Sequence, residues 1–351
     1  MSFVARRLAA PGGPDQIEAV ELRESDPADG PVARIAVGAG NTLYYFADAR
    51  IAGGRNLLHF PWRDLREYRE NQELGGNPFL YPWANRLEDP TGFNFRGRRV
   101  AFPDSPPVWR DGNGLPLHGC LLKDNHWRML DLHADAVAAH CSAEQTFDAT
   151  HPAFACFPFH HRVVMTHRLD RDPAGRVRLT LTTRVLNLGD EALPLTFGYH
   201  PYFSFAPFTR DQVRIDLPVT QCFDTDDRLL PTGGVTAVEK LWPAHRDLTL
   251  GAYAFDHGFT GLVRNDSESS GTADFQLITP DRRVTVCFGA GYDVAVVYAP
   301  VATGADFVCF EPMLGPTNHL GRVGGDAWPA LRTLAPGAEF EVTFAIIAEG
   351  R

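Results

Sequence analysis

Glycine and proline are spread over the whole chain, and they limit the length of its regular elements. The 351 residues include 32 glycines and 27 prolines, and many segments between them are short and β-prone. The chain contains no strand–helix–strand repeat, no GxGxxG and no GxxxxGK[ST] loop, and the GNG at 112–114 indicates only a turn. This pattern predicts an all-β protein of many short strands joined by turns, and it argues against a doubly wound parallel sheet.

Several strands can be read directly from the sequence. Residues 177–187 (VRLTLTTRVLN) alternate apolar and polar side chains over part of their length, as in a half-buried strand. They follow HHRVVMTHRL across a polar loop at 170–176, so the two segments predict a hairpin. A second hairpin is predicted from 130–133 and 136–141, and further strands from 293–298, 307–310 and 339–348.

Helical signals are few. Residues 63–71 (RDLREYREN) predict a short helix, and residues 326–331 predict a single helical turn. No shift in composition marks a linker between domains. We therefore expect residues 1–351 to form one large, mainly antiparallel β domain with few short helices.

The charge balance disfavours two classes of partner. The chain has 43 acidic and 33 basic residues and a net charge of −10. Because phosphate binding needs a basic surface, we expect neither nucleic acid nor an anionic membrane as partner. No apolar run approaches the ~20 residues of a membrane-spanning helix, and the N-terminal sequence has no apolar core of signal-peptide length.

The cysteines and most histidines predict no metal site. The six cysteines form no CxxC pair and lie mostly among apolar neighbours, which predicts buried free thiols in a reducing cytoplasm. Of the 13 histidines, most, including His126 and His151, have no recognisable ligand spacing. Surface or hydrogen-bonded roles are favoured for them, and we expect no metal and no cofactor.

Five segments place rare polar groups in apolar or glycine-flanked surroundings, and the first two supply Asn85, Arg86 and His118. Asn85 and Arg86 end the apolar stretch of GGNPFLYPWANRLE, where an arginine can bind ring hydroxyls or form a structural salt bridge. His118 is the only titratable group of LPLHGCL, and Gly119 allows another backbone to approach closely. A core histidine held by a hydrogen bond is the alternative for His118.

The other three segments supply a histidine and two carboxylates. His200 lies among aromatic residues in LTFGYHPYFSF, and such surroundings lower a histidine pKa. Asp256, in FDHGFTGL, is expected in a turn or loop, where it could bind sugar hydroxyls or simply form the turn. Glu311, in FVCFEPMLGPT, is expected at the end of a strand that Pro312 stops, and burial there would raise its pKa towards that of a base.

In their order and approximate spacing, these segments resemble those of the aldose 1-epimerase (galactose mutarotase-like) family, over roughly residues 74–320. The resemblance implies a large antiparallel β-sandwich, or supersandwich, with the sugar in a cleft on one face. It implies that Glu311 is the general base, His200 the general acid and His118 a second active-site histidine. Arg86 and Asp256 correspond to groups that orient the sugar hydroxyls, and Asn85 is grouped with them.

The segments HPYF and EPMLGPTN are similar to those of a less-characterised bacterial branch of that family. Classical galactose mutarotases carry a histidine segment closer to NHTYFNL, so the identity of the hexose stays open. A free hexose is the expected substrate, and the protein is expected to be a monomer or homodimer.

Anomer exchange suits these residue types. A base must take the C1 hydroxyl proton and an acid must protonate the ring oxygen, after which the C1–C2 bond rotates and the ring closes on its other face. A glutamate and a histidine can hold the two different pKa values that this exchange requires. No metal, cofactor or nucleophile is needed.

Three alternatives to a free-hexose epimerase stay open. Lys123, in HGCLLKDNHW, is one of two lysines in the chain and is a weak phosphate signal, so a hexose-6-phosphate 1-epimerase is the first. A non-catalytic sugar-binding protein on the same fold is the second, because a fold alone does not give activity. A glycosidase, the third, needs two carboxylates facing one bond and would leave His118 and His200 without a role.

Overall fold

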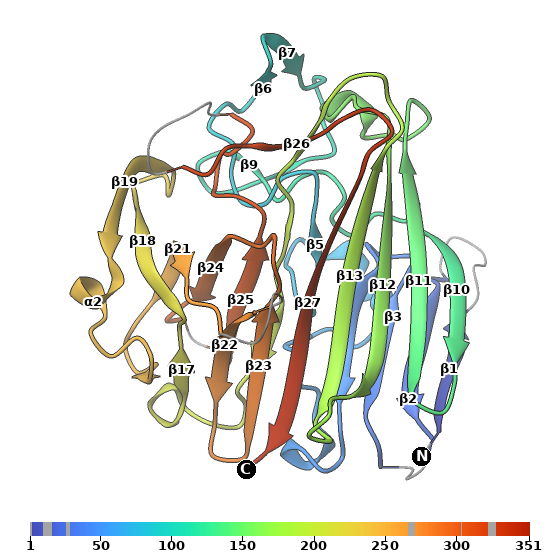
Figure 1. The fold of residues 1–351 in the computed structure, drawn as a ribbon, viewed down its shortest axis with the longest axis vertical. Coiled ribbons are helices and arrows are strands. Elements are labelled where there is room, and N and C mark those ends of the chain that lie inside the picture. The colour runs from blue at the N-terminus through green and yellow to red at the C-terminus, as the bar shows by residue number, and fades with distance from the viewer. Residues whose placement is uncertain (1, 10–15, 26–28, 266–270, 303, 322–327) are drawn as a thin grey trace.

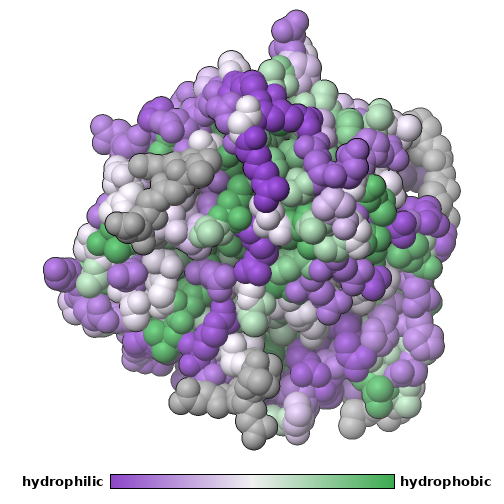
Figure 2. Space-filling model, turned by 45° about the horizontal axis from the view of Figure 1, so that its top comes forward, coloured by the Kyte–Doolittle hydropathy of each residue, from purple (hydrophilic) through white to green (hydrophobic). Residues whose placement is uncertain are grey.

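The computed structural model describes residues 2–9, 16–25, 29–265, 271–302, 304–321 and 328–351. Antiparallel strands dominate it, as the sequence predicts (Figure 1). None of the helices in this part of the chain is both long and apolar enough to cross a membrane. Figure 2 shows hydrophilic residues over much of one face of the molecule, with hydrophobic residues in separate patches.

The largest sheet has nine strands in the order β10-β11-β12-β13-β27-β23-β22-β17-β20. The long strands β11, β12, β13 and β27 run side by side in Figure 1. In β13 buried residues alternate with more accessible ones, since one face of the sheet packs on the core. The strands are β10 Arg128–Ala134, β11 Ala138–Phe147, β12 His161–Arg171, β13 Val177–Asn187, β17 Arg214–Asp216, β20 Leu248–Thr249, β22 Ala273–Ile278, β23 Arg282–Phe288 and β27 Glu339–Gly350.

Two further sheets lie against the nine-stranded one. The eight-stranded sheet has the order β19-β18-β21-β24-β25-β15-β5, with β16 also paired to β25. Its strands are β5 Phe79–Leu80, β15 Gly198–Tyr199, β16 Tyr202–Ser204, β18 Val219–Thr225, β19 Pro231–Ala237, β21 Phe255–Leu262, β24 Val294–Ala299 and β25 Phe307–Met313. The four-stranded sheet, whose β1 and β2 lie against β10 and β11, comprises β1 Phe3–Ala9, β2 Ala19–Glu24, β3 Val32–Ala36 and β4 Thr42–Ala47.

Aromatic side chains join the two large sheets. The ring centroid of Phe275 in β22 lies 4.5 Å from that of Phe288 in β23 and 5.8 Å from that of Phe310 in β25. One apolar cluster includes residues of all three sheets, among them Leu22, Leu181 and Phe310. The fold is therefore a sandwich around a shared core, held by burial of apolar surface.

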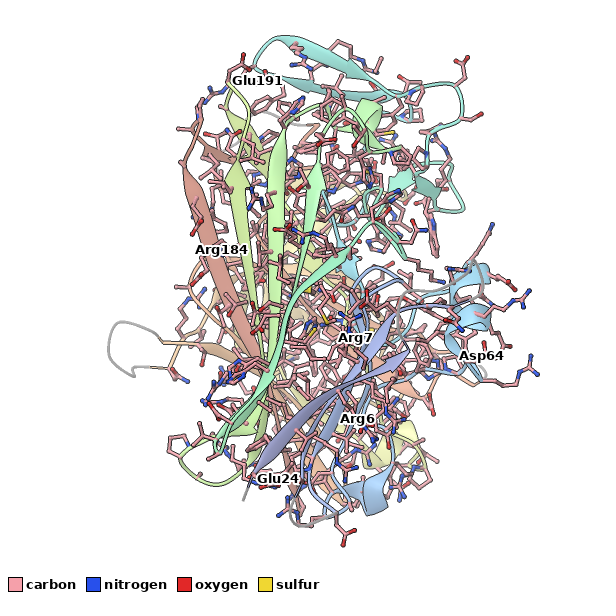
Figure 3. All side chains as sticks on the ribbon, turned by 90° about the vertical axis from the view of Figure 1, so that its right-hand side faces the viewer. Arg6, Arg7, Glu24, Asp64, Arg184 and Glu191 are labelled. Atoms are coloured by element: carbon pink, nitrogen blue, oxygen red, sulfur yellow. The ribbon has the colours of Figure 1, made fainter. Side chains whose placement is uncertain are left out.

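Short elements complete the described fold. The remaining strands are β6 Gly92–Phe95, β7 Arg98–Ala101, β8 Trp109–Arg110, β9 Pro116–Leu117, β14 Leu193–Leu195 and β26 Arg332–Leu334. The helices are α1 Leu65–Glu70 and α2 Val238–Leu241, with 3-10 turns at Ala52–Gly54, Phe154–Cys156 and Arg210–Gln212. Asp64 begins α1 by accepting a hydrogen bond from the Glu67 N–H, and it lies at the outer margin of the molecule (Figure 3).

Most of the predicted elements are confirmed. The strand at 177–187 is β13, both hairpins form, and α1 lies within the predicted 63–71. All six cysteines are unpaired and buried. Of the predicted turn at 326–331, residues 326 and 327 lie outside the described residues, and residues 328–331 are not helical.

Two predictions about the backbone were wrong. Asp256 does not lie in a turn but in β21, because β18 and β24 pair with the two edges of β21 and override the turn preference of its glycines. Pro312 does not stop its strand, since β25 continues to Met313. On the side of β25 that faces β15 and β16, the pairing is interrupted at residues 310–312, where a proline without an N–H can be tolerated.

Candidate active site

The register of β25 brings a histidine and a glutamate together. β15 pairs with the end of β25, and β16 pairs with its first half, in one continuous antiparallel register. Residues 199–201 lie between these two pairings. The register places His200 directly across from Glu311, at the spacing of a cross-strand pair.

His200 and Glu311 form a buried acid–base pair. The Nε2 atom of His200 lies 3.4 Å from Oε1 of Glu311 and 3.3 Å from the hydroxyl of Tyr202, whose ring stacks on the imidazole. Burial lowers the pKa of His200 to about 3. Burial, assisted by Asp256 and opposed by Arg86, raises the pKa of Glu311 well above its usual value. Burial therefore favours the neutral form of each group.

His118 is held by reciprocal backbone contacts with Asn85. The His118 N–H donates to the Asn85 carbonyl at 2.9 Å, and the Asn85 N–H donates to Nδ1 of His118 at 3.2 Å. Because Nδ1 accepts this bond, the neutral ring carries its hydrogen on Nε2. Burial first, and then the nearby His200 and Arg86, lower the pKa of His118 well below its usual value. His118 is thus a fixed neutral donor, with its ring centroid 5.4 Å from that of His200.

Gly119 makes the position of His118 attainable. Its φ is +77°, and a Cβ atom there would lie 2.0 Å from the carbonyl oxygen of Tyr81. Only glycine fits such an approach, which confirms the close backbone contact predicted from the sequence. His118 itself has a φ of +61°, so the loop carries strain that the surrounding contacts must hold.

Arg86 lies between two carboxylates. Its Nε donates to Asp111 at 2.8 Å, and a terminal nitrogen lies 3.6 Å from a carboxylate oxygen of Asp256. Burial alone would raise the pKa of Asp111, but Arg86 and two backbone N–H groups hold it below its usual value. Asp111 therefore fixes the guanidinium, and the more exposed Asp256 stays accessible at the cavity.

The pairing of β21, β24 and β25 explains why Asp256 and Glu311 share a face. Asp256 lies opposite Tyr298 in β24, Tyr298 lies opposite Cys309 in β25, and Glu311 follows two residues later. Residues paired across strands, or two apart along one strand, lie on the same face of a sheet. Both carboxylates and the Tyr298 hydroxyphenyl group therefore extend from the face opposite the main core.

All six predicted site residues line one cavity of about 300 Å³, at the lower end of the range for small-molecule sites. The structure thus brings Asn85, Arg86, His118, His200, Asp256 and Glu311 together. Sequence reasoning missed Gln72, Leu74, Trp109, Arg110, Leu117, Tyr202 and Tyr298, which line the same cavity, and Asp111 behind Arg86. Only Tyr202 carried a signal, since it lies two residues after His200 in an extended segment.

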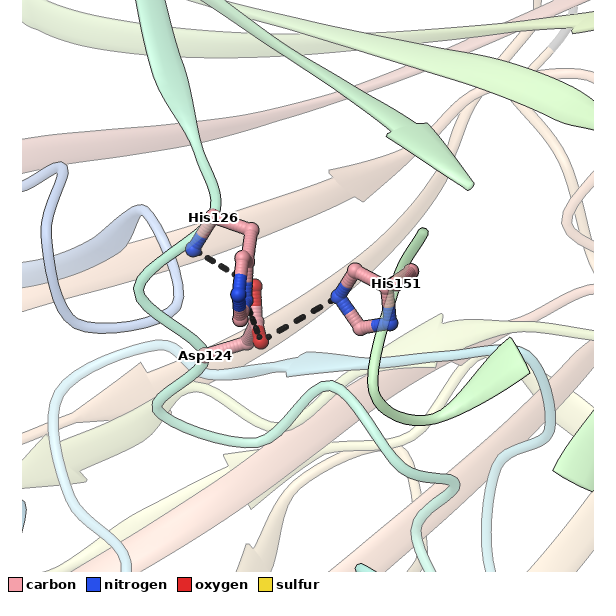
Figure 4. Close-up of side chains that lie close together, drawn as sticks. All are labelled: Asp124, His126 and His151. Carbon is pink, nitrogen blue, oxygen red and sulfur yellow. Dashed lines mark hydrogen bonds and ion pairs between the residues drawn. The ribbon is translucent and has the colours of Figure 1, made fainter. Parts of the chain in front are cut away.

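A second cluster, Asp124, His126 and His151, shows how three residues without ligand spacing can still meet (Figure 4). His126 Nδ1 and His151 Nε2 lie 2.8 Å and 3.4 Å from Asp124 Oδ1. His151 Nδ1, however, accepts the N–H of Ala153. A metal on Nε2 would need a hydrogen on Nδ1, which would face that N–H. The arrangement therefore suits a hydrogen-bonded carboxylate better than a metal site.

Comparisons with known proteins agree with the fold. A galactose mutarotase-like protein from Clostridium acetobutylicum superposes with a TM-score of 0.82 at 18% identity, covering 100% of this chain and 99% of that one. The GalM/aldose epimerase homologue from C. elegans gives a TM-score of 0.68 at 15% identity, covering 99% of each chain. At these identities the likeness shows the fold alone.

Sequence comparison gives the family. The uncharacterized protein YphB of Escherichia coli (strain K12) is 29% identical over 189 residues, which are 51% of this chain and 57% of YphB. A family model described as Aldose 1-epimerase matches residues 52–346, and this range contains all six predicted site residues. Because that match covers most of the sequence, the chain belongs to the aldose 1-epimerase family.

Proposed function

We propose that this protein is an aldose 1-epimerase that interconverts the α and β anomers of a free hexose. The observation that carries the proposal is the buried pair of His200 and Glu311, 3.4 Å apart on one wall of a sugar-sized cavity. A carboxyl group and an imidazole at this distance can pass a proton between them, so one partner can accept a proton while the other donates one. Family membership supports the same reaction class.

In the proposed cycle, a proton first passes from Glu311 to His200, whose Nε2 lies 3.4 Å from the carboxyl group. Ionised Glu311 then takes the proton of the C1 hydroxyl, and His200 protonates the ring oxygen. The C1–O5 bond breaks and the aldehyde forms. Rotation about C1–C2 then exposes the other face of the aldehyde. On reclosure the two residues exchange roles, and both return to their starting protonation states. Each proton that leaves one group arrives on another, so the cycle needs no further reactant.

The neighbouring side chains can orient the sugar. The hydrogen on Nε2 of His118 is a donor in a fixed position, suited to an oxygen near the reacting centre. The guanidinium of Arg86 and the carboxylate of Asp256 offer a donor and an acceptor to vicinal hydroxyls. Arg86 also lowers the pKa of Glu311, so its charge favours the ionised base that the reaction requires.

A free sugar is favoured over a hexose 6-phosphate because of the position of Lys123. Its Nζ atom donates to the carbonyls of Tyr68, Asn71 and Glu73, so no N–H remains for a phosphate. Arg86 is bound to Asp111, and Arg110 donates to the carbonyls of Gly114 and Pro90. Lys123 and Arg110 are thus already engaged, and Arg86 keeps its terminal nitrogens, one of them 3.6 Å from Asp256, for a sugar hydroxyl.

Polarimetry on freshly dissolved α-glucose and α-galactose tests the proposal. Wild-type protein should accelerate the change in rotation, and the variants Glu311→Gln and His200→Asn should not. If wild type binds a sugar by calorimetry but does not accelerate mutarotation, the protein is a sugar-binding protein and the proposal is wrong.

A further inference from the structure

Lys123 is a buried cation that the proposed reaction does not use. It is 8% exposed, and it lies five residues after His118 in the same loop. Its Nζ atom donates to the carbonyls of Tyr68, Asn71 and Glu73 at 2.6, 2.7 and 2.8 Å. An ammonium group has three hydrogens, so these bonds use all of its donors.

Three aromatic rings enclose the same ammonium group. Its Nζ atom lies 4.2 Å from the ring centroid of Tyr68, 5.2 Å from that of Trp109 and 5.4 Å from that of Trp62. A cation over aromatic faces at this range is attracted to the ring electrons, and more strongly when water is excluded. The carbonyls and the rings together offset the cost of burying the charge.

The groups around Lys123 belong to three separate segments, and each segment lines the cavity. Gln72 and Leu74 lie just after α1, among the carbonyls that Lys123 binds. Trp109 forms part of β8 and is itself a lining residue. His118 belongs to the loop that carries Lys123.

These segments have little regular structure of their own. α1 has six residues and β8 has two, and isolated helices of this length are not stable in water. Their positions must therefore come from tertiary contacts. The ammonium group of Lys123 is the point at which all three segments meet.

We propose that Lys123 is a positioning residue for sugar binding, whose ammonium group fixes the rim of the cavity, which consists of residues 71–74 and β8. This inference rests on the proposed function, because it takes the ligand that the rim helps to bind to be a sugar. Lys123 does not touch the sugar itself, since its three donors are bound to carbonyls. Its loss should loosen residues 71–74 and β8 while leaving His200 and Glu311 in place on the eight-stranded sheet.

The test compares Lys123→Met with the matched control Lys240→Met, which changes the other lysine of the chain, an exposed residue of α2. KM for the preferred hexose should rise about tenfold in Lys123→Met, with kcat within a few-fold of wild type and no change in the control. A residue that merely supported the fold would reduce the amount of active enzyme and leave KM unchanged, so an unchanged KM overturns the proposal.

Two further variants separate charge from geometry and guard against misfolding. Lys123→Arg should not restore the wild-type KM, because a planar guanidinium cannot direct three hydrogens to three carbonyls around one point. Lys123→Gln retains two donors, so its KM should lie between those of wild type and Lys123→Met. If Lys123→Met does not fold, Lys123→Gln takes its place in the test. A wild-type KM in Lys123→Arg or Lys123→Gln would contradict the proposed geometry.

Hydrogen–deuterium exchange gives a readout that does not depend on catalysis. Amides of residues 71–75 and 108–111 should exchange faster in Lys123→Met than in wild type, while β24 and β25 exchange as before. Unchanged exchange at the rim refutes the role of Lys123 whatever the kinetics. If wild type does not interconvert the anomers, the proposed function fails. The hydrogen–deuterium exchange data then decide on their own whether Lys123 holds the rim.

Discussion

Replacing Glu311 with glutamine would test both the chemistry and the electrostatics of the pair. Glu311 is 1% exposed, and one of its carboxyl oxygens lies 3.4 Å from His200 Nε2. Glutamine keeps the shape of the side chain and removes its basicity. Because burial raises the pKa of Glu311, the cavity already favours a neutral group at this position, and the variant should fold normally.

The expected loss of rate follows from the role of one general base. Such a group contributes about 10²–10⁴ in rate, which corresponds to about 2.7–5.4 kcal/mol of activation free energy. We expect kcat to fall by this amount while sugar affinity stays within a few-fold of wild type. His200→Asn should give a similar fall, and the double variant should lose less than the product of the two, because the residues act as one proton-transfer unit.

The same substitution has a stability consequence with a defined sign. Folded Glu311 keeps its proton to a higher pH than the unfolded chain does, so its contribution is present below the ordinary carboxyl pKa and is lost as pH rises through the folded pKa. Glutamine does not ionise, so the stability of Glu311→Gln does not fall with pH for this reason. The variant should therefore gain stability relative to wild type as pH rises above about 4.3.

Anomer exchange measured by NMR saturation transfer, sugar binding by calorimetry and urea unfolding at several pH values check these expectations. Near wild-type turnover of glucose and galactose by Glu311→Gln would refute its role as base. A stability difference that did not change with pH would refute the raised pKa. A loss of binding equal to the loss of rate would instead indicate that Glu311 holds the sugar.

Four further outcomes can be measured. Arg86→Lys should raise KM about tenfold and affect kcat less, because lysine cannot donate from a planar fork; wild-type kinetics would place Arg86 outside the site. His167 is buried with its pKa lowered to about 3, so wild type should lose about 1.4 kcal/mol per pH unit at this residue as pH falls below about 6.5. Urea unfolding of His167→Leu should show this acid slope reduced by that amount, and an unchanged slope would contradict it. Glucose should be turned over faster than glucose 6-phosphate, because Lys123 has no free donor; the reverse preference by polarimetry would favour the phosphorylated substrate. EDTA should leave the rate unchanged, and a loss that zinc or manganese restored would contradict the cofactor-free mechanism.

Local pattern predicts the long strands well. Residues 177–187 alternate in polarity because β13 has one face on the core, so burial alone defines the strand and its bounds. The same logic fails for β21, where the glycines of FDHGFTGL favour a turn by local preference. Strand β21 forms because β18 and β24 supply partners on both edges, and residue preferences do not encode such partners.

The candidate residues could be predicted, but not their arrangement. A polar residue within an apolar run can be recognised from its local sequence alone, which is why Glu311, His200 and His118 can be selected from the sequence. Asp111 carries no such signal, because DGNG is an ordinary turn sequence and its contact with Arg86 depends on the fold. Lys123 is the opposite case, since a lone lysine suggests a phosphate, and only the fold shows that its donors are bound to three carbonyls.

The pair of His200 and Glu311 depends on an irregularity in a sheet. Had β15 and β16 formed one continuous strand, the ladder would have run past residues 310–312, where Pro312 cannot donate a bond. On its other edge the segment stays in register with β5, where the His200 N–H donates to the Pro78 carbonyl, while the His200 ring stacks on Tyr202 and faces Glu311. Pairing on either side of the gap still fixes the register, and Glu311 also pairs with Val296 of β24, so the two groups are held by a rigid sheet although they do not pair with each other. A proline that would end an isolated strand is therefore compatible with a strand that continues to Met313 and holds Glu311 opposite His200.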